Sequence, residues 1–146
     1  MKGWRTIFHS NGPQKKAGVA ILTSDKLKFI PKTVLRDEEG HCIILKGSFQ
    51  QEDLTIMNIY TTNVGNAKYI NQLITKVKTY LDNNTLILGD FNTALYVNDR
   101  YSKHDVSKET RALYDTLDQM DFTAIYSTLH LNATEYILLK CTWSFF

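Results

Sequence analysis

The chain has 146 residues, of which 43% are hydrophobic and 22% charged, and this length and composition suit one soluble globular domain. Its formal net charge of +2 is compatible with nucleic-acid binding but too small to indicate it. The only two cysteines, Cys42 and Cys141, exclude a disulfide framework and a zinc motif and favour a reducing, intracellular setting.

Short apolar runs separated by turn signals dominate the first half of the chain. The continuous runs at Gly18–Thr23 and Cys42–Lys46 predict strands that are covered on both faces. Leu54–Tyr60 predicts a third strand, because it is a further apolar run bounded by polar residues. Side chains alternate along a strand, so one face of this third strand should carry Leu54, Ile56, Asn58 and Tyr60.

The second half begins with a change of period. Apolar residues at helical spacing predict a helix over Ala67–Leu81, with Asn66 as its N-cap. Thr85–Gly89 predicts a fourth strand, and Ser107–Met120 predicts a second helix that Ser107 caps. Phe122–Leu129 fits no single type of element. Strands combined with helices in this way predict an α/β or α+β domain.

Neither end of the chain has the features of a membrane or export segment. The amino end lacks the apolar core of a signal peptide, and the apolar tail EYILLKCTWSFF is too short to span a bilayer. We therefore expect no membrane association. Because soluble domains rarely expose such a tail, we also expect the chain to be a fragment that lacks both ends of its domain.

The sharpest local motif is LILGDFNT at Leu86–Thr93. Asp90 and Asn92 follow an apolar strand, and positions i and i+2 share one face if the strand geometry continues. An Asp can act as a base toward water, and an Asn can bond a phosphate oxygen without adding charge. A polar turn after a buried strand is the plainer alternative, and the residues alone favour it.

A second polar group follows the strand before the first helix. In NIYTTN, at Asn58–Asn63, Tyr60 offers a hydroxyl and Asn63 a carboxamide. The alternative is a packed aromatic ring followed by a turn asparagine. Taken alone, this motif is weak.

Taken together, NIY-x-x-N and GDFN, separated by one amphipathic helix, resemble the exonuclease–endonuclease–phosphatase superfamily, which includes the abasic-site endonucleases and exodeoxyribonuclease III. The resemblance is greatest to the endonuclease domain of long interspersed element retrotransposons. It extends over KGWR (2–5), QKKAGVAIL (14–22), ETRALYDTLDQMD (109–121) and the Glu135-Tyr136 pair. It implies a partial four-layer αββα sandwich, truncated at both ends, and Mg²⁺-dependent hydrolysis of DNA phosphodiester bonds in the nucleus.

The resemblance also implies a role for each matching residue. Asp90 would hold or activate the attacking water and is a possible magnesium ligand, and Asn92 would orient that water or the scissile phosphate. Tyr60 would bind the phosphate and stabilise charge in the transition state. Asn63 would support Tyr60, and Arg100 would contact the DNA backbone.

Several family positions have no counterpart in this chain. The family's upstream Asn and Glu, of which the Glu is a main magnesium ligand, are absent, as are its downstream Asp and Asp-His pair. The histidines present are interpreted as surface or loop residues: His9, His41, His104 and His130. The chain departs from the family at Ile137, which predicts a partial domain over 1–136 and an unrelated apolar tail over 137–146.

These departures predict an impaired or inactive enzyme of low stability. Asp90 alone is a poor magnesium site, and losing one catalytic donor can lower a rate by ~100-fold. Stability below the usual ~5–15 kcal/mol is expected. The alternative is a non-enzymatic, retrotransposon-derived remnant that binds DNA weakly through Lys15, Lys16 and Arg100. Lipid and inositol phosphatases share the fold, but the extended match disfavours them. The sequence indicates no oligomeric state.

Overall fold

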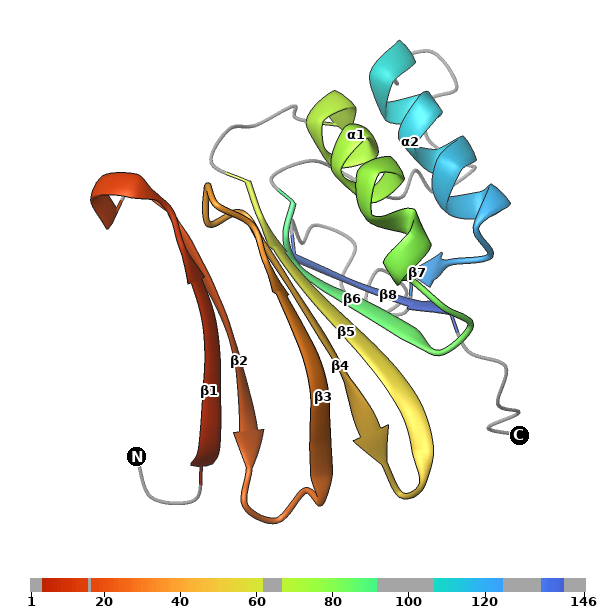
Figure 1. Cartoon of the computed structure of the whole chain (residues 1–146). Helices are drawn as coiled ribbons and strands as arrows, with labels where there is room; N and C mark the ends of the chain where they lie inside the picture. Colours follow the sequence, from red (N-terminus) through yellow and green to blue (C-terminus); the bar gives the residue numbers. More distant parts are fainter. Residues whose placement is uncertain (1–3, 16, 62–66, 92–106, 125–134, 141–146) are drawn as a thin grey trace.

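The computed structural model describes residues 4–15, 17–61, 67–91, 107–124 and 135–140, which form two sheets and two helices (Figure 1). The sheets are built from β1 (Trp4–Asn11), β2 (Gly18–Ser24), β3 (Phe29–Arg36), β4 (Cys42–Phe49), β5 (Glu52–Tyr60), β6 (Thr85–Asp90), β7 (Thr123–Ala124) and β8 (Glu135–Lys140). The helices are α1 (Ala67–Val77) and α2 (Lys108–Gln119), with short 3-10 turns η1 (Pro13–Lys15) and η2 (Lys78–Tyr80).

The larger sheet is mixed, with the strand order β3-β4-β5-β6-β8-β7. Only β5 and β6 are parallel, and α1 connects them, as a parallel pair requires. The smaller sheet is the antiparallel hairpin β1-β2. Figure 1 shows the two helices on one face of the large sheet and the hairpin on the other. The described residues thus form three layers, helix, sheet and sheet, which match a partial αββα sandwich.

The apolar run of β4 is continuous because this strand lies between two hydrophobic cores. Cys42 and Ile44 belong to the core beneath the helices, whereas Ile43 and Leu45 belong to the core beneath the hairpin. All four side chains are at most 3% exposed. The prediction of a strand covered on both faces is therefore confirmed for β4, which both cores share. For β2 it is wrong, because Val19 and Ile21 are buried whereas Ala20 on the other face is exposed.

The two predicted helices are confirmed with small changes at their ends. The α-helical part of the first one ends at Val77, and the 3-10 turn η2 continues it to Tyr80. Ser107 caps the second helix, since its Oγ accepts a hydrogen bond of 3.1 Å from the amide of Thr110. Leu113 and Leu117 of α2 are buried toward α1 and the sheet. The expected cap Asn66 lies outside the described residues.

Strands β1 and β3 were not predicted as elements. Most of β3 is exposed, and it lies at one edge of the large sheet, where Pro31 and Lys32 discourage pairing with a further strand. Without a buried face, its sequence lacks the alternation that would reveal a strand. Of the ambiguous segment 122–129, the described part contains the two-residue strand β7.

Strand β8 crosses residue 136, where the family-like part of the sequence was expected to end. Leu86 and Thr85 of β6 pair in register with Leu139 and Lys140 of β8, so residues 137–140 belong to the large sheet. The unrelated origin of 137–146 stays a prediction. Among the described residues, no helix is both long and apolar enough to cross a bilayer.

Candidate functional site

Tyr60 and Asp90 end two neighbouring parallel strands at the same level. In the register of β5 with β6, Tyr60 pairs with Asp90, and the amide of Thr61 donates to the carbonyl of Asp90 over 3.1 Å. Both side chains are half-buried. The structure therefore brings together two residues that stand 30 positions apart and were predicted to act at one site. The carboxyl ends of parallel strands are a usual place for sites in such sheets.

Gly89 allows β6 to approach β5 this closely. Its φ is +145°, and a Cβ atom built there would lie 1.8 Å from the carbonyl oxygen of Ile59. No L side chain fits at that distance. The glycine of the GDFN motif is thus required by the packing of the two strands, and the required close approach places Asp90 beside Tyr60.

A buried ring anchors the end of β6. Phe91 is fully buried in the core beneath the helices, and its carbonyl accepts a hydrogen bond of 2.7 Å from the hydroxyl of Thr61, which is itself 1% exposed. Thr61 thus makes two hydrogen bonds to the end of β6, one from its amide to the Asp90 carbonyl and one from its hydroxyl to the Phe91 carbonyl. These bonds hold together the backbone segments that carry Tyr60 and Asp90. The site edge is therefore rigid in its backbone, a property that helps to hold reacting groups in place.

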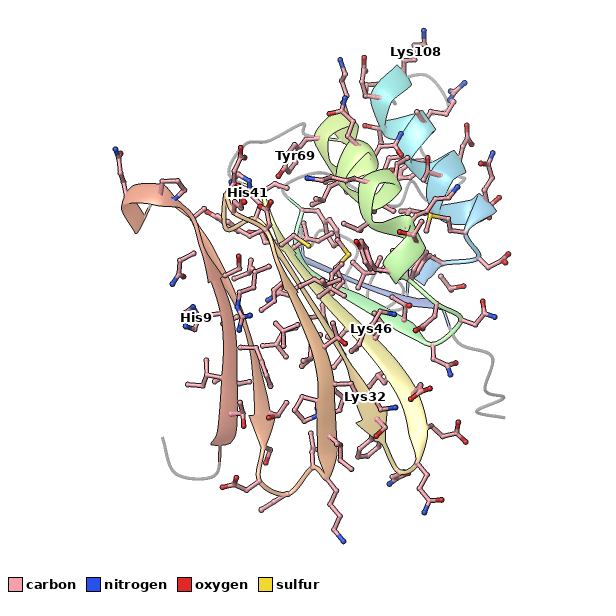
Figure 2. The ribbon with its side chains drawn as sticks, in the orientation of Figure 1. His9, Lys32, His41, Lys46, Tyr69 and Lys108 are labelled. Carbon is pink, nitrogen blue, oxygen red and sulfur yellow. The ribbon has the colours of Figure 1, made fainter. Side chains whose placement is uncertain are left out.

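His41, in the turn that precedes β4, is joined to Tyr60 through the backbone, and sequence reasoning did not identify it; its imidazole lies toward α1, whereas the Tyr60 ring packs against the core beneath the hairpin. The carbonyl of His41 accepts the amide of Tyr60 over 2.9 Å, and its Nδ1 lies 2.9 Å from the Tyr69 hydroxyl on α1 (Figure 2). The two rings meet edge-on, with centroids 5.6 Å apart. His41 does lie in a turn, as expected, but it is half-buried. No local pattern could reveal this role, because Tyr69 is 28 residues away.

The Tyr69 hydroxyl remains protonated near neutral pH. Partial burial raises its pKa above the ordinary value, and the carboxylates of Asp37 and Glu39 raise it further. Glu39 also lies 3.6 Å from Nδ1 of His41. A neutral hydroxyl can donate to the imidazole, so this contact links the first turn of α1 to the turn that precedes β4.

The turn between β1 and β2 packs closely against the turn between β3 and β4, beside the ends of β5 and β6. Gly40 has a φ of +76°, and a Cβ atom there would lie 2.2 Å from the amide nitrogen of Gly12. The buried hydroxyl of Ser10 donates to the carbonyl of Asp37 over 2.6 Å, and the Asp37 carboxylate accepts the His41 amide. The turn that precedes His41 is therefore held from both sides.

The remaining predicted site residues cannot be placed relative to this edge. Asn63, Asn92 and Arg100 lie outside the described residues, as does Lys16. On β8, the register with β6 puts Glu135 opposite Asp90. The position of Glu135 beside Asp90 is given by the strand register alone.

The described residues do not assemble a complete magnesium site. Within them, no three or more His, Cys, Asp or Glu side chains are close enough to hold a metal ion. Asp90 could supply one carboxylate, and magnesium usually takes one or two together with waters or phosphate oxygens.

The sequence matches no protein-family model. The structure is similar to solved structures of 10–11% sequence identity. The endonuclease domain of TRAS1, a telomere-specific non-LTR retrotransposon, gives a TM-score of 0.64, with 96% of this chain and 68% of that one covered. A truncated form of TDP2 from Caenorhabditis elegans gives a TM-score of 0.54, with 94% of this chain and 62% of that one covered. A humanized TDP2 from D. rerio gives a TM-score of 0.56, with 97% of this chain and 60% of that one covered.

These similarities extend over nearly the whole of this chain but over only 60–68% of the proteins it resembles. At such low identity they establish a common fold and leave the activity open. The fold itself agrees with the resemblance seen in the sequence motifs. The chain therefore shares the fold of the TRAS1 retrotransposon endonuclease domain and of TDP2.

Proposed function

We propose that the chain is part of a DNA phosphodiesterase whose reacting phosphate lies at the carboxyl ends of β5 and β6. The single observation that carries this proposal is the pairing of Tyr60 with Asp90 at the exits of two parallel strands. A phenol donor and a carboxylate acceptor are complementary to a phosphate oxygen and an attacking water. The fold shared with a retrotransposon endonuclease domain supports the choice of DNA as substrate.

The proposed roles follow from what each group can donate or accept. The Tyr60 hydroxyl donates to a non-bridging phosphate oxygen and stabilises the charge that develops there. The Asp90 carboxylate accepts a proton from the water that attacks phosphorus. Asn92 orients that water, Asn63 supports Tyr60, and Arg100 contacts the DNA backbone. Dependence on Mg²⁺ and action in the nucleus belong to the proposal through the sequence resemblance alone.

A second candidate function is weak DNA binding without hydrolysis. One observation favours it: the described residues offer no group of three metal-binding side chains around Asp90. A site with too few ligands for its metal would keep phosphate affinity and lose most of its rate, since removing one catalytic donor already costs ~100-fold.

Nicking of supercoiled plasmid by the folded chain, with Mg²⁺ or with chelator, separates the two functions. Because the departures from the family predict an impaired enzyme, we expect slow nicking that requires Mg²⁺ and falls by a further ~100-fold or to background in Asp90→Asn. Asp53→Asn is the matched control, because Asp53 is an exposed carboxylate at the opposite end of the same strand as Tyr60. It should nick as the unmodified chain does.

Salt-dependent DNA binding without any nicking would support the second function. Nicking that persists in Asp90→Asn would contradict the site. A folded chain that neither nicks nor binds DNA would contradict both functions.

A further inference from the structure

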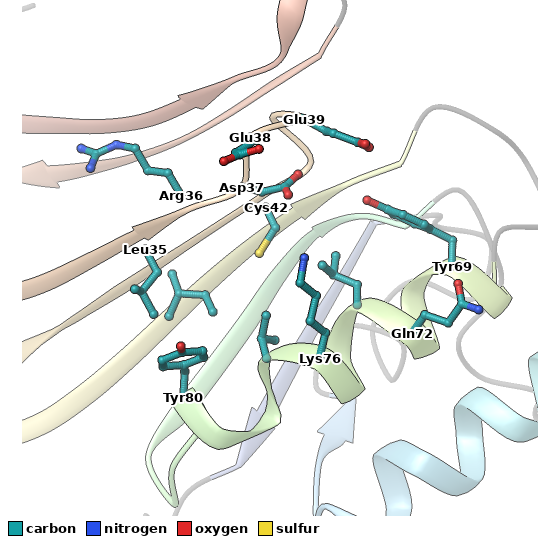
Figure 3. Close-up of a pocket in the computed structure, with 13 residues that line it drawn as sticks. Leu35, Arg36, Asp37, Glu38, Glu39, Cys42, Tyr69, Gln72, Lys76 and Tyr80 are labelled. Carbon is teal, nitrogen blue, oxygen red and sulfur yellow. The ribbon is translucent and has the colours of Figure 1, made fainter.

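A groove opens on the helix-covered face of the large sheet, beside α1. One wall is the outer part of the sheet, β3 and β4, and the other is α1 with η2 (Figure 3). Its volume is about 650 Å³, within the usual range for ligand-binding clefts of ~300–1,000 Å³. The groove lies here because α1 packs against α2 and the central strands, and among the described residues no other element covers this side of β3 and β4.

The floor of the groove is apolar and accessible. Leu35 of β3 and Val77 of α1 are half-buried, and Tyr80 of η2 is 46% exposed although it is one of the larger apolar side chains. Below them lies Cys42, whose pKa is raised to about 12 by burial and, to a smaller extent, by the Asp37 carboxylate. Its thiol stays protonated and unreactive, so the groove is suited to non-covalent binding.

One end of the groove is strongly acidic. Asp37, Glu38 and Glu39 stand together on the turn between β3 and β4, and Figure 3 shows them above the groove, with Lys76 of α1 extending toward them. The Arg36 guanidinium keeps its charge but points away from this end in Figure 3, and its Nε donates to the carbonyl of His9 on β1 over 2.9 Å. Three carboxylates against one ammonium repel a phosphate backbone and attract cations.

We propose that this groove docks an amphipathic helix of a partner protein that carries Lys or Arg residues beside its apolar stripe. The apolar stripe would lie on Leu35, Val77 and Tyr80, and the basic residues would meet the turn at 37–39. The wall of the groove extends along the helix from residue 69 to 80, which corresponds to about 17 Å at 1.5 Å per residue. A partner helix of about three turns matches that length, and its anchors would recur every three or four residues.

The test is selection followed by titration. A phage-displayed library of helical peptides is selected on the immobilised full chain, and the selected peptides are synthesised and titrated by fluorescence anisotropy. We expect them to combine an apolar stripe with Lys or Arg. Two groove variants, Tyr80→Asp and the double variant Glu38→Lys/Glu39→Lys, should each weaken binding at least ~10-fold, and higher salt should weaken it too.

Matched controls alter exposed residues away from the groove. Ile30 is 64% exposed on β3 and Glu52 is exposed at the start of β5, so Ile30→Asp and Glu52→Lys should bind within about twofold of the unmodified chain. Urea unfolding of each variant checks that it is folded before binding is measured.

Four outcomes overturn the proposal. They are no selected peptide, selected peptides without basic residues, binding that Tyr80→Asp leaves unchanged, and a dimer of this chain that Tyr80→Asp abolishes. The last would assign the groove to a second copy of the chain. None of these outcomes bears on the proposed nicking at Asp90, which is measured separately.

Discussion

Replacing Gly89 by Ala tests whether the close approach of β6 to β5 builds the site edge. The added methyl would start 1.8 Å from the carbonyl oxygen of Ile59, where ordinary carbon–oxygen contact needs well over 3 Å. A φ of +145° also strains any L residue, at a cost of ~1–3 kcal/mol. Because the obstacle is backbone of the neighbouring strand, only movement of β6 relieves it, at the expense of buried packing. Together these costs amount to roughly 2–6 kcal/mol, which is comparable with the low stability expected of this chain, so Gly89→Ala should be largely unfolded even without urea.

The assay is urea unfolding followed by circular dichroism, with Gly18→Ala as the matched control. A Cβ atom at Gly18 would meet the side-chain oxygen of Asn11 at 2.9 Å, and that side chain can turn away. We therefore expect a loss of less than about 1 kcal/mol for Gly18→Ala. If Gly89→Ala unfolds at the same urea concentration as Gly18→Ala, the strand approach does not require a glycine and the account of the site edge is wrong.

Three further substitutions test the packing and the polar contacts. Leu113→Ala should cost about 2–5 kcal/mol in urea unfolding, because Leu113 is fully buried between α2 and the sheet; a loss below 1 kcal/mol would contradict that packing. Tyr69→Phe keeps the ring and removes the bond to His41, so a loss of about 1 kcal/mol is expected in the same assay, and no loss would mean that the bond is unimportant. Although burial raises the pKa of Asp82, hydrogen bonds from Thr55, the Asn84 amide and Lys46 together lower it below its ordinary value. Its stabilising effect is then complete above the unfolded pKa and is lost as pH falls through the folded one. Asp82→Asn should therefore cost up to about 1 kcal/mol at pH 7, given its partial exposure, and nothing below that acid range; a cost independent of pH would refute the assignment.

The sequence predicted well those elements whose buried faces determine the spacing of apolar residues along the chain. The stripe of α1 reports one buried face, and the uninterrupted apolar run of β4 reports two. The cap Ser107 was readable because a cap acts within three residues. By contrast, β3 has no buried face of its own along most of its length, so nothing in its local pattern distinguishes it from a loop.

The candidate site divides in the same way. The GDFN and NIY-x-x-N motifs identified Asp90 and Tyr60 as chemistry-bearing positions at strand exits, and Gly89 was visible in the motif. The sequence could not show why that glycine is needed, because the obstacle is the backbone of Ile59 on another strand. It also could not link His41 to Tyr60 and to α1, since those contacts depend on the pairing of β4 with β5 and on the packing of Tyr69.

By itself, the sequence determined the types of most elements, the buried faces of β4 and of the helices, and which residues are candidates for the site. Only the tertiary structure decided that Tyr60 and Asp90 are register partners, that the β1-β2 hairpin forms a layer of its own, and that a groove with an acidic end remains beside α1. The physical reason is range. Periodicity and capping act over a few residues, whereas strand pairing and layer packing depend on the free energy of contacts between segments far apart in the chain.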